Sequence, residues 1–189
     1  MALALAFLAA DHDAARAEAP AWRAWRKPVP DFILPALDGN DAAFAGADDR
    51  IVLVHFFATW CLPCRAELPA LQRFAARAGA ARLKVLVVSA AEPDSRVRRL
   101  RDELALTLPI LLDRDRAVIK AWQVALLPTS VVLGPGSSTR FGVEADMPWD
   151  QVDPDALIRA ATPPRPEPGA RSGEPPPELQ REEAHSEGG

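Results

Sequence analysis

The stretch VHFFATWCLPCRAELPAL, residues 54–71, contains both cysteines of this 189-residue chain. Cys61 and Cys64 stand two residues apart, directly after an apolar run. That run, residues 50–57, is typical of a strand buried on both faces, and we expect a helix over residues 62–78. The two thiols could form a redox pair, half of a metal site, or two small core residues.

The composition is that of a soluble globular protein, with 49% hydrophobic and 25% charged residues. The 22 Lys and Arg against 26 Asp and Glu give a net charge of -4, and no basic stripe occurs, which argues against nucleic acid as a partner. Two cysteines cannot build a disulfide scaffold of the small secreted kind. They also cannot fill a four-ligand zinc site, because the histidines, His12, His55 and His185, are scattered.

Strand and helix signals alternate between residues 31 and 161, which predicts an α/β sheet with helices on both faces, mostly parallel at its centre. Asp94 is expected to cap its helix, and Pro154 suits a first helical position. The expected strands are 31–37, 50–57, 82–90, 108–113, 128–134 and 139–143, and the expected helices are 62–78, 94–106, 116–124 and 153–161.

Residues 1–19 are interpreted as a signal peptide or an N-terminal anchor. Residues 1–10 are apolar and too short to span a bilayer, and ARA at 15–17, with small residues at 15 and 17, suits a cleavage site. No positive charge precedes the apolar run, and acidic residues crowd the cleavage region. A short amphipathic tail is the alternative, but we expect export, with a membrane tether if the segment stays uncleaved.

The chain is divided into a linker at 20–30, a domain at 31–162 and a tail at 163–189. Within the linker, Trp22 and Trp25 are expected to pack against the domain surface. The tail is rich in Pro, Gly and Glu and has few apolar residues, so we expect it to be disordered.

The position of the cysteines favours the redox interpretation. Backbone N–H groups at a helix N-terminus stabilise a thiolate, which is the nucleophile in disulfide exchange. We expect Cys61 to be the more exposed, attacking sulfur and Cys64 to resolve the mixed disulfide. Pro63 stiffens the two-residue spacer between them.

The chain resembles the TlpA/ResA/CcmG-like thiol–disulfide oxidoreductases, which have a thioredoxin-like fold. The resemblance implies a central mixed sheet with helices on both faces and a TlpA-type insertion, which residues 88–113 supply. Peroxiredoxins share the general fold, but their Thr-x-x-Cys context is absent. The motifs that carry the resemblance are PDFILPALDGN, IVLVHFFATWCLPCRAELPAL, LPILLDRDRAVIKAWQVALLPTSVVLG and DMPWDQV.

The resemblance also implies roles for residues near the pair. Pro128 matches a cis-proline that faces the CxxC motif, which would let the Leu127 backbone pair with an extended substrate segment. An ordinary strand-opening proline is the alternative. Trp60 would shield the disulfide and offer an apolar docking surface, or serve a purely structural role.

Two ionisable residues carry open alternatives. His55 would take the proton of Cys64 during resolution, or it is a core histidine bonded to a backbone carbonyl. It replaces the buried acid of thioredoxin and the Asn common in TlpA-like proteins. Glu67, on the same helical side as Cys64, would raise the thiol pKa values, or it is a solvated helix residue.

The predicted function is an exported thiol–disulfide oxidoreductase in the periplasm or another extracytoplasmic space. The resemblance implies a reductase of protein disulfides that takes electrons from a membrane thiol carrier, with cytochrome c apoproteins as the best-known clients. No cofactor or metal is expected, because the two sulfurs carry the electrons. The alternatives are a Sco-like copper-binding chaperone and a non-catalytic, redox-regulated interaction module.

Overall fold

The computed structural model describes residues 21–163. The predicted signal or anchor at 1–19 and all but the first residue of the predicted tail lie outside that range. The strands are β1 (Arg23–Ala24), β2 (Phe32–Pro35), β3 (Asp41–Phe44), β4 (Ile51–Phe57), β5 (Leu83–Ala90), β6 (Ile110–Asp113), β7 (Thr129–Leu133) and β8 (Arg140–Val143). The helices are α1 (Leu62–Ala78), α2 (Asp94–Glu103), α3 (Ala117–Ala121) and α4 (Pro154–Ala161), with a 3-10 turn at Pro135–Ser137.

The main sheet is mixed, as predicted, with the strand order β1-β8-β7-β4-β5-β6. The neighbours β4, β5 and β6 are parallel, whereas β7 pairs antiparallel with both β4 and β8. All seven residues of β4 are buried, which explains why its sequence is a nearly continuous apolar run. The prediction of a mostly parallel centre therefore holds for one half of the sheet only.

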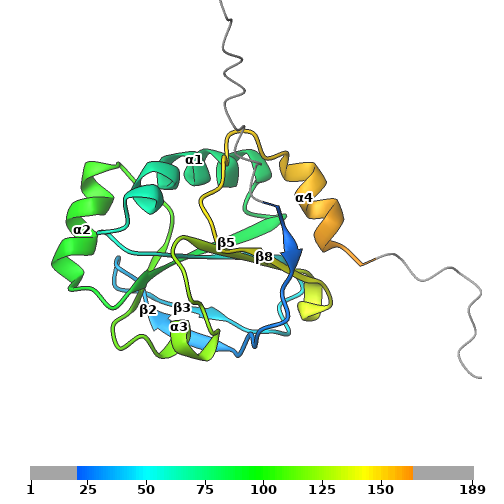
Figure 1. The fold of residues 1–189 in the computed structure, drawn as a ribbon, viewed down its shortest axis with the longest axis horizontal. Coiled ribbons are helices and arrows are strands. Elements are labelled where there is room, and N and C mark those ends of the chain that lie inside the picture. Colours follow the sequence, from blue (N-terminus) through cyan, green and yellow to red (C-terminus); the bar gives the residue numbers. More distant parts are fainter. Residues whose placement is uncertain (1–20, 164–189) are drawn as a thin grey trace, which may run out of the picture.

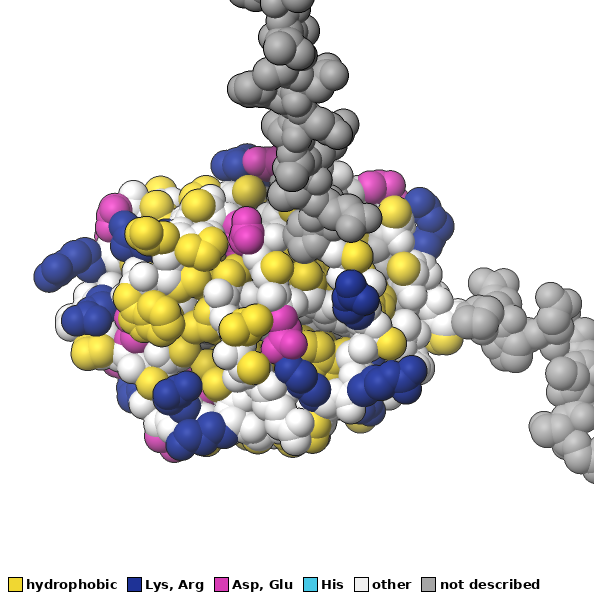
Figure 2. Space-filling view, in the orientation of Figure 1, with side chains coloured by type: hydrophobic (Ala, Val, Ile, Leu, Met, Phe, Trp, Pro, Cys, Tyr) yellow, Lys and Arg dark blue, Asp and Glu magenta, His cyan; other side chains and the backbone are white. Residues whose placement is uncertain are grey.

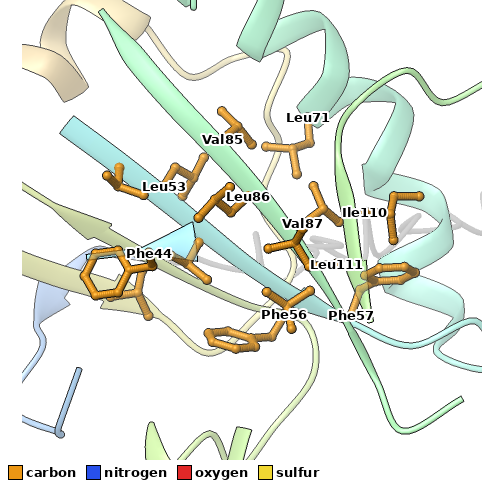
Figure 3. Close-up of a cluster of buried hydrophobic side chains, with 14 of the residues drawn as sticks. Phe44, Leu53, Phe56, Phe57, Leu71, Val85, Leu86, Val87, Ile110 and Leu111 are labelled. Carbon is orange, nitrogen blue, oxygen red and sulfur yellow. The ribbon is translucent and has the colours of Figure 1, made fainter. Parts of the chain in front are cut away.

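Helices cover both faces of this sheet (Figure 1). Helices α1 and α4 lie on one face, and α3 lies on the other face together with the β2–β3 hairpin. Figure 3 shows Leu71 of α1 beside Val85 and Val87, while Phe44 of β3 lies toward Phe56 of β4. The alternation of side chains along β4 and β5 thus divides the core into two layers.

The insertion between β5 and α3 consists of α2 and β6, and β6 extends the sheet. The prediction that Asp94 caps α2 is wrong, because Pro93 occupies the N-cap position without a side-chain bond. Asp94 lies in the first turn instead, where its carboxylate accepts hydrogen bonds from Arg114 at 2.9 and 2.7 Å. The prediction that Pro154 opens the last helix is confirmed, and Asp153 caps it.

The segment predicted as a linker packs partly on the domain. Strand β1 pairs with β8, and Trp25 is buried. Trp22 makes edge contacts with Phe141 and Trp149, so the predicted packing of both tryptophans is confirmed. A Cβ atom on Gly142 would stand 2.6 Å from the Trp25 ring, so this position of β8 must be glycine for Trp25 to fit.

The far edge of the sheet is covered by residues that follow β2. Ala36 forms an isolated bridge with Leu111, and the N–H of Leu37 donates to the carbonyl of Ile110 at 2.8 Å. The expected edge strand at 31–37 is thus only partly right, since Phe32–Pro35 pairs with β3 in a separate two-stranded sheet.

Candidate active site

Cys61 and Cys64 are joined by a disulfide bond, with a Cα–Cα distance of 5.3 Å. Cys61 is the N-cap residue of α1, and its Sγ accepts a hydrogen bond from the Cys64 N–H at 3.3 Å. Cys61 is 5% exposed and Cys64 is fully buried, which is the order of exposure expected for an attacking and a resolving sulfur. The two cysteines do lie in the buried core, as in the alternative interpretation, but the bond between them shows that they are more than small core residues.

The local sequence explains why the pair lies at the end of a strand and the start of a helix. Strand β4 ends at Phe57, and a turn closes where the Cys61 N–H donates to the Ala58 carbonyl at 3.1 Å. Pro63 lies in the first turn of α1, where backbone N–H groups have no partner within the helix, so the lack of an N–H in proline costs no hydrogen bond. The helix then runs through Pro69 to Ala78, as predicted.

Exposed apolar side chains flank the disulfide. Trp60 is 65% exposed, Leu62 76% and Leu126 60%, which are high values for such large residues. On the face shown in Figure 2, hydrophobic side chains gather in patches, while Lys and Arg are scattered and form no stripe. The exposed Trp60, Leu62 and Leu126 therefore favour contact with an apolar surface.

The first turn of α1 contains a single basic residue, Arg65, and no acidic one. The Arg65 guanidinium donates to Glu103 of α2 at 2.7 Å, so its charge is paired with a carboxylate. The α1 N-terminus is thus left with its backbone N–H groups as the main positive contribution near Cys61.

Glu67 is buried one turn beyond Cys64, so the interpretation as a solvated helix residue is wrong. Its Oε2 accepts hydrogen bonds from the Met147 N–H at 2.7 Å and from the Trp149 indole N–H at 3.2 Å. Burial raises the pKa of the Glu67 carboxyl from 4.5 to about 8, although the two hydrogen bonds partly oppose this. Glu67 is therefore largely neutral at neutral pH.

His55 lies fully buried on β4 and faces Glu67. Its Nδ1 is 2.9 Å from the Ser130 hydroxyl, so the expected backbone carbonyl partner is replaced by a serine. Its Nε2 is 3.5 Å from Glu67 Oε1, and neither of these two buried atoms has another hydrogen-bond partner among the described residues. Burial lowers the pKa of His55 from 6.5 to about 3, so the imidazole is neutral.

The Leu127–Pro128 peptide bond is cis, as the resemblance implied. Leu127 lies just outside the ladder between β7 and β4, whose first pair is Thr129 with Phe56. A groove of about 450 Å³ runs from Trp60 to Leu127. Its other lining residues are Ala90, Ala91, Arg116, Ile119, Val124, Ala125 and Leu126.

Sequence reasoning missed several partners of these groups. Ser130, Met147 and Trp149 come from segments 75 to 82 residues away from the groups they contact. Glu92, which bonds the turn before Cys61, was also missed. The one available signal was a Glu directly after the apolar run of β5.

Comparisons with known proteins agree with this geometry. Residues 25–138 match the AhpC/TSA family. The thiol–disulfide oxidoreductase ResA of Geobacillus thermodenitrificans is 31% identical over 124 residues, covering 66% of this chain and 71% of ResA. ResA of Geobacillus kaustophilus is 27% identical over 125 residues, covering 66% of this chain and 72% of its own length.

Solved structures share the fold. A thiol:disulfide interchange protein of Chlorobium tepidum has a TM-score of 0.61 at 21% identity, covering 71% of this chain and 95% of its own. StoA of Bacillus subtilis has a TM-score of 0.58 at 22% identity, covering 69% and 96%. With a bonded Cys61–Cys64 pair at the start of α1, the chain belongs to the AhpC/TSA family and is a TlpA/ResA/CcmG-like thiol–disulfide oxidoreductase.

Proposed function

We propose that this oxidoreductase works as a reductase of protein disulfides outside the cytoplasm. The observation that carries the direction is the buried carboxyl of Glu67, on the same face of α1 as Cys64 and without a cation beside it. A strong oxidant stabilises its reduced form through a low thiol pKa. Here neither neighbouring group lowers a thiol pKa in this way, because Glu67 is largely neutral at neutral pH and Arg65 is bound to Glu103.

The exchange proceeds in two balanced steps. The Cys61 thiolate attacks one sulfur of a client disulfide, forming a mixed disulfide and releasing the first client thiolate. Cys64 then loses its proton and attacks Cys61 Sγ, which forms the intramolecular disulfide and releases the second client thiolate. The two released thiolates take up the two protons that Cys61 and Cys64 gave up, so the client gains two electrons and two protons, and a dithiol carrier restores the reduced pair by the reverse sequence.

Glu67 is the proposed site of the proton that Cys64 exchanges: its carboxylate form, the minor form at pH 7, takes the proton in the resolving step, and the protonated carboxyl returns it when the carrier reduces the pair. It lies three residues after Cys64 on the same helical side, and its Oε1 is the oxygen left without a donor. His55 then acts as the buried neutral acceptor facing that oxygen rather than as the base itself. No cofactor enters this proposal, because the electrons stay on sulfur.

Location and partners follow from the resemblance and from residues 1–19. Among residues 21–163, no helix has both the length and the apolar character needed to cross a bilayer. We assign export, or tethering, to the apolar N-terminal segment, which would deliver the domain to a membrane thiol carrier. Cytochrome c apoproteins are the proposed client class.

Redox titration against glutathione tests the direction. We expect a reduction potential near that of thioredoxin, about -270 mV, and below that of the glutaredoxins. A value near the -120 mV of DsbA would overturn the reductive assignment. Glu103→Gln, which frees Arg65, should move the potential upward, whereas Glu67→Gln should change it little at pH 7 and raise it above pH 8, where the carboxyl ionises.

Trapping identifies the clients. In the Cys64→Ser variant the mixed disulfide on Cys61 cannot be resolved, so clients should stay covalently attached, whereas Cys61→Ser should capture none. Recovery of apocytochrome c through its haem-binding cysteines would support the proposed class. In a second experiment, oxidised apocytochrome c is supplied together with the other client proteins. If it is not captured on Cys61, the client assignment fails.

A further inference from the structure

Glu92 is a buried acid that contacts the active-site turn from outside the CxxC motif. It follows β5 and is 7% exposed. Its Oε2 accepts the backbone N–H of Thr59 at 2.6 Å, and its Oε1 accepts the Thr59 hydroxyl. Thr59 stands two residues before Cys61, so one side chain satisfies both donors of the residue that leads into the reactive sulfur.

Satisfying these two donors with a buried carboxylate has a cost in free energy. Burying a charge is unfavourable unless it is paired or fully hydrogen-bonded, and a neutral amide or carbonyl would accept the same N–H. The nearest cation is Arg96, whose Nη1 lies 4.0 Å from Glu92 Oε1 on a side chain that is 60% exposed. What a carboxylate adds is strength, since charge-assisted hydrogen bonds are about twice as strong as neutral ones.

The backbone around Glu92 is bent so that this side chain points inward. Ala91 has a φ of 49°, a left-handed conformation that residues with a Cβ rarely adopt. Its N–H donates to the Asp113 carbonyl at 2.9 Å, and Pro93 occupies the N-cap position of the next helix. Strained residues of this kind persist where the surrounding structure fixes them, often next to functional sites.

We propose that Glu92 is a positioning residue for disulfide exchange, holding Thr59 so that Trp60 and Cys61 keep their places through the cycle. The turn must stay in register while Cys61 passes from disulfide to thiolate to mixed disulfide. A displacement of about 1 Å in a reacting group can cost about 100-fold in rate. The same bond joins two segments that line the groove, because Trp60 follows Thr59 and Ala91 precedes Glu92.

The test compares variants by the rate at which the reduced protein reduces a protein disulfide, with kcat and KM measured separately. Glu92→Gln keeps the shape and should lower kcat about 10-fold. Thr59→Val keeps only the backbone bond and should lower it less, whereas Thr59→Ser keeps both bonds and should retain the wild-type rate. The matched control is Asp155→Asn on α4. It removes an exposed carboxylate that is bonded to Arg82 and should change neither kcat nor KM.

Coupling separates a positioning role from a purely structural one. If Glu92 acts through Thr59, the double variant Glu92→Gln, Thr59→Val should be no slower than Glu92→Gln alone. Rates that multiply, or a folded Glu92→Gln protein within twofold of wild type, would overturn the proposal. If Glu92→Gln does not fold, a wild-type rate in Thr59→Val would overturn it instead.

Discussion

The two faces of β4 are equally buried, but only one of them includes a polar side chain. On one face Phe56 meets the Trp122 ring at 5.4 Å, and Phe32 and Phe44 surround the same indole. On the other face, one residue earlier, His55 lies among a serine and a carboxyl group. The aromatic face needs only close packing, whereas every polar atom on the other face needs a partner. That polar face is the one that carries the cysteine helix.

The largest effect is expected on the aromatic face. Trp122→Ala should lower the free energy of unfolding by about 3–5 kcal/mol, because it empties a fully buried site among three aromatic rings. Urea unfolding measures this, with Trp122→Phe as the milder control. The reduction potential of the folded variant should stay unchanged. A changed potential would show that the two faces are not independent.

The polar face should show itself in the pH dependence of stability. Folded His55 and Glu67 together hold one proton, on Glu67, between their pKa values of about 3 and 8. The unfolded chain, with ordinary pKa values of 6.5 and 4.5, also holds one proton on the two groups between pH 4.5 and 6.5. This pair therefore contributes a plateau in that range.

Outside the plateau the pair destabilises the fold in both directions. Above pH 6.5 the folded state alone retains the proton, so stability falls by about 1.4 kcal/mol per pH unit up to the Glu67 pKa. Below pH 4.5 the unfolded state binds the extra proton, and stability falls as pH falls.

Single variants should make stability depend on pH within the range where the wild-type pair contributes a plateau. His55→Asn should lose stability as pH rises above 4.5, and Glu67→Gln should lose it as pH falls below 6.5. Urea titrations at several pH values measure both slopes. Parallel curves for wild type and both variants would mean that the pair does not share its proton in this way.

A smaller effect is expected from Ser130→Ala. It removes the hydroxyl bonded to His55 Nδ1 and leaves a buried polar atom without its partner, at a cost of about 1 kcal/mol. Thermal unfolding at pH 7 measures this loss, and Ser130→Thr is the control that keeps a hydroxyl. A neutral outcome would indicate that His55 finds another hydrogen-bond partner.

The smallest effect is expected at the surface. Arg65→Ala breaks a partly exposed ion pair with Glu103 and should cost less than about 1 kcal/mol. Its reduction potential should move by less than about 10 mV, because the guanidinium is already paired. A larger shift would place the Arg65 charge within the electrostatics of the cysteines.

Much of the fold could be predicted, because its signals are local. Helix α1 has the predicted bounds, since Cys61 caps it, Pro63 suits its first turn and Gly79 ends it. The strands lie within a few residues of their apolar runs. The prediction that Asp94 caps α2 was wrong because the preceding residue, Pro93, occupies the cap position. Residue preferences alone do not decide between two such neighbours.

The site was harder to predict, since its polar contacts join distant segments. The burial of Glu67 depends on a loop 80 residues later that folds over the helix. The partner of His55 is set by strand register, which places Ser130 directly opposite it on β7. The cysteines themselves were evident from spacing and context, but the groups that set their protonation were not.

The coverage of both sheet edges has a consequence for association. β1 lies along β8 at one end of the sheet, and the bridge from Ala36 to Leu111 occupies part of the other. Unpaired strand edges invite intermolecular strand addition and aggregation. The stretch between residues 23 and 37 thus protects both edges of the main sheet. A chain shortened past Trp25 would expose the edge of β8 to other protein molecules.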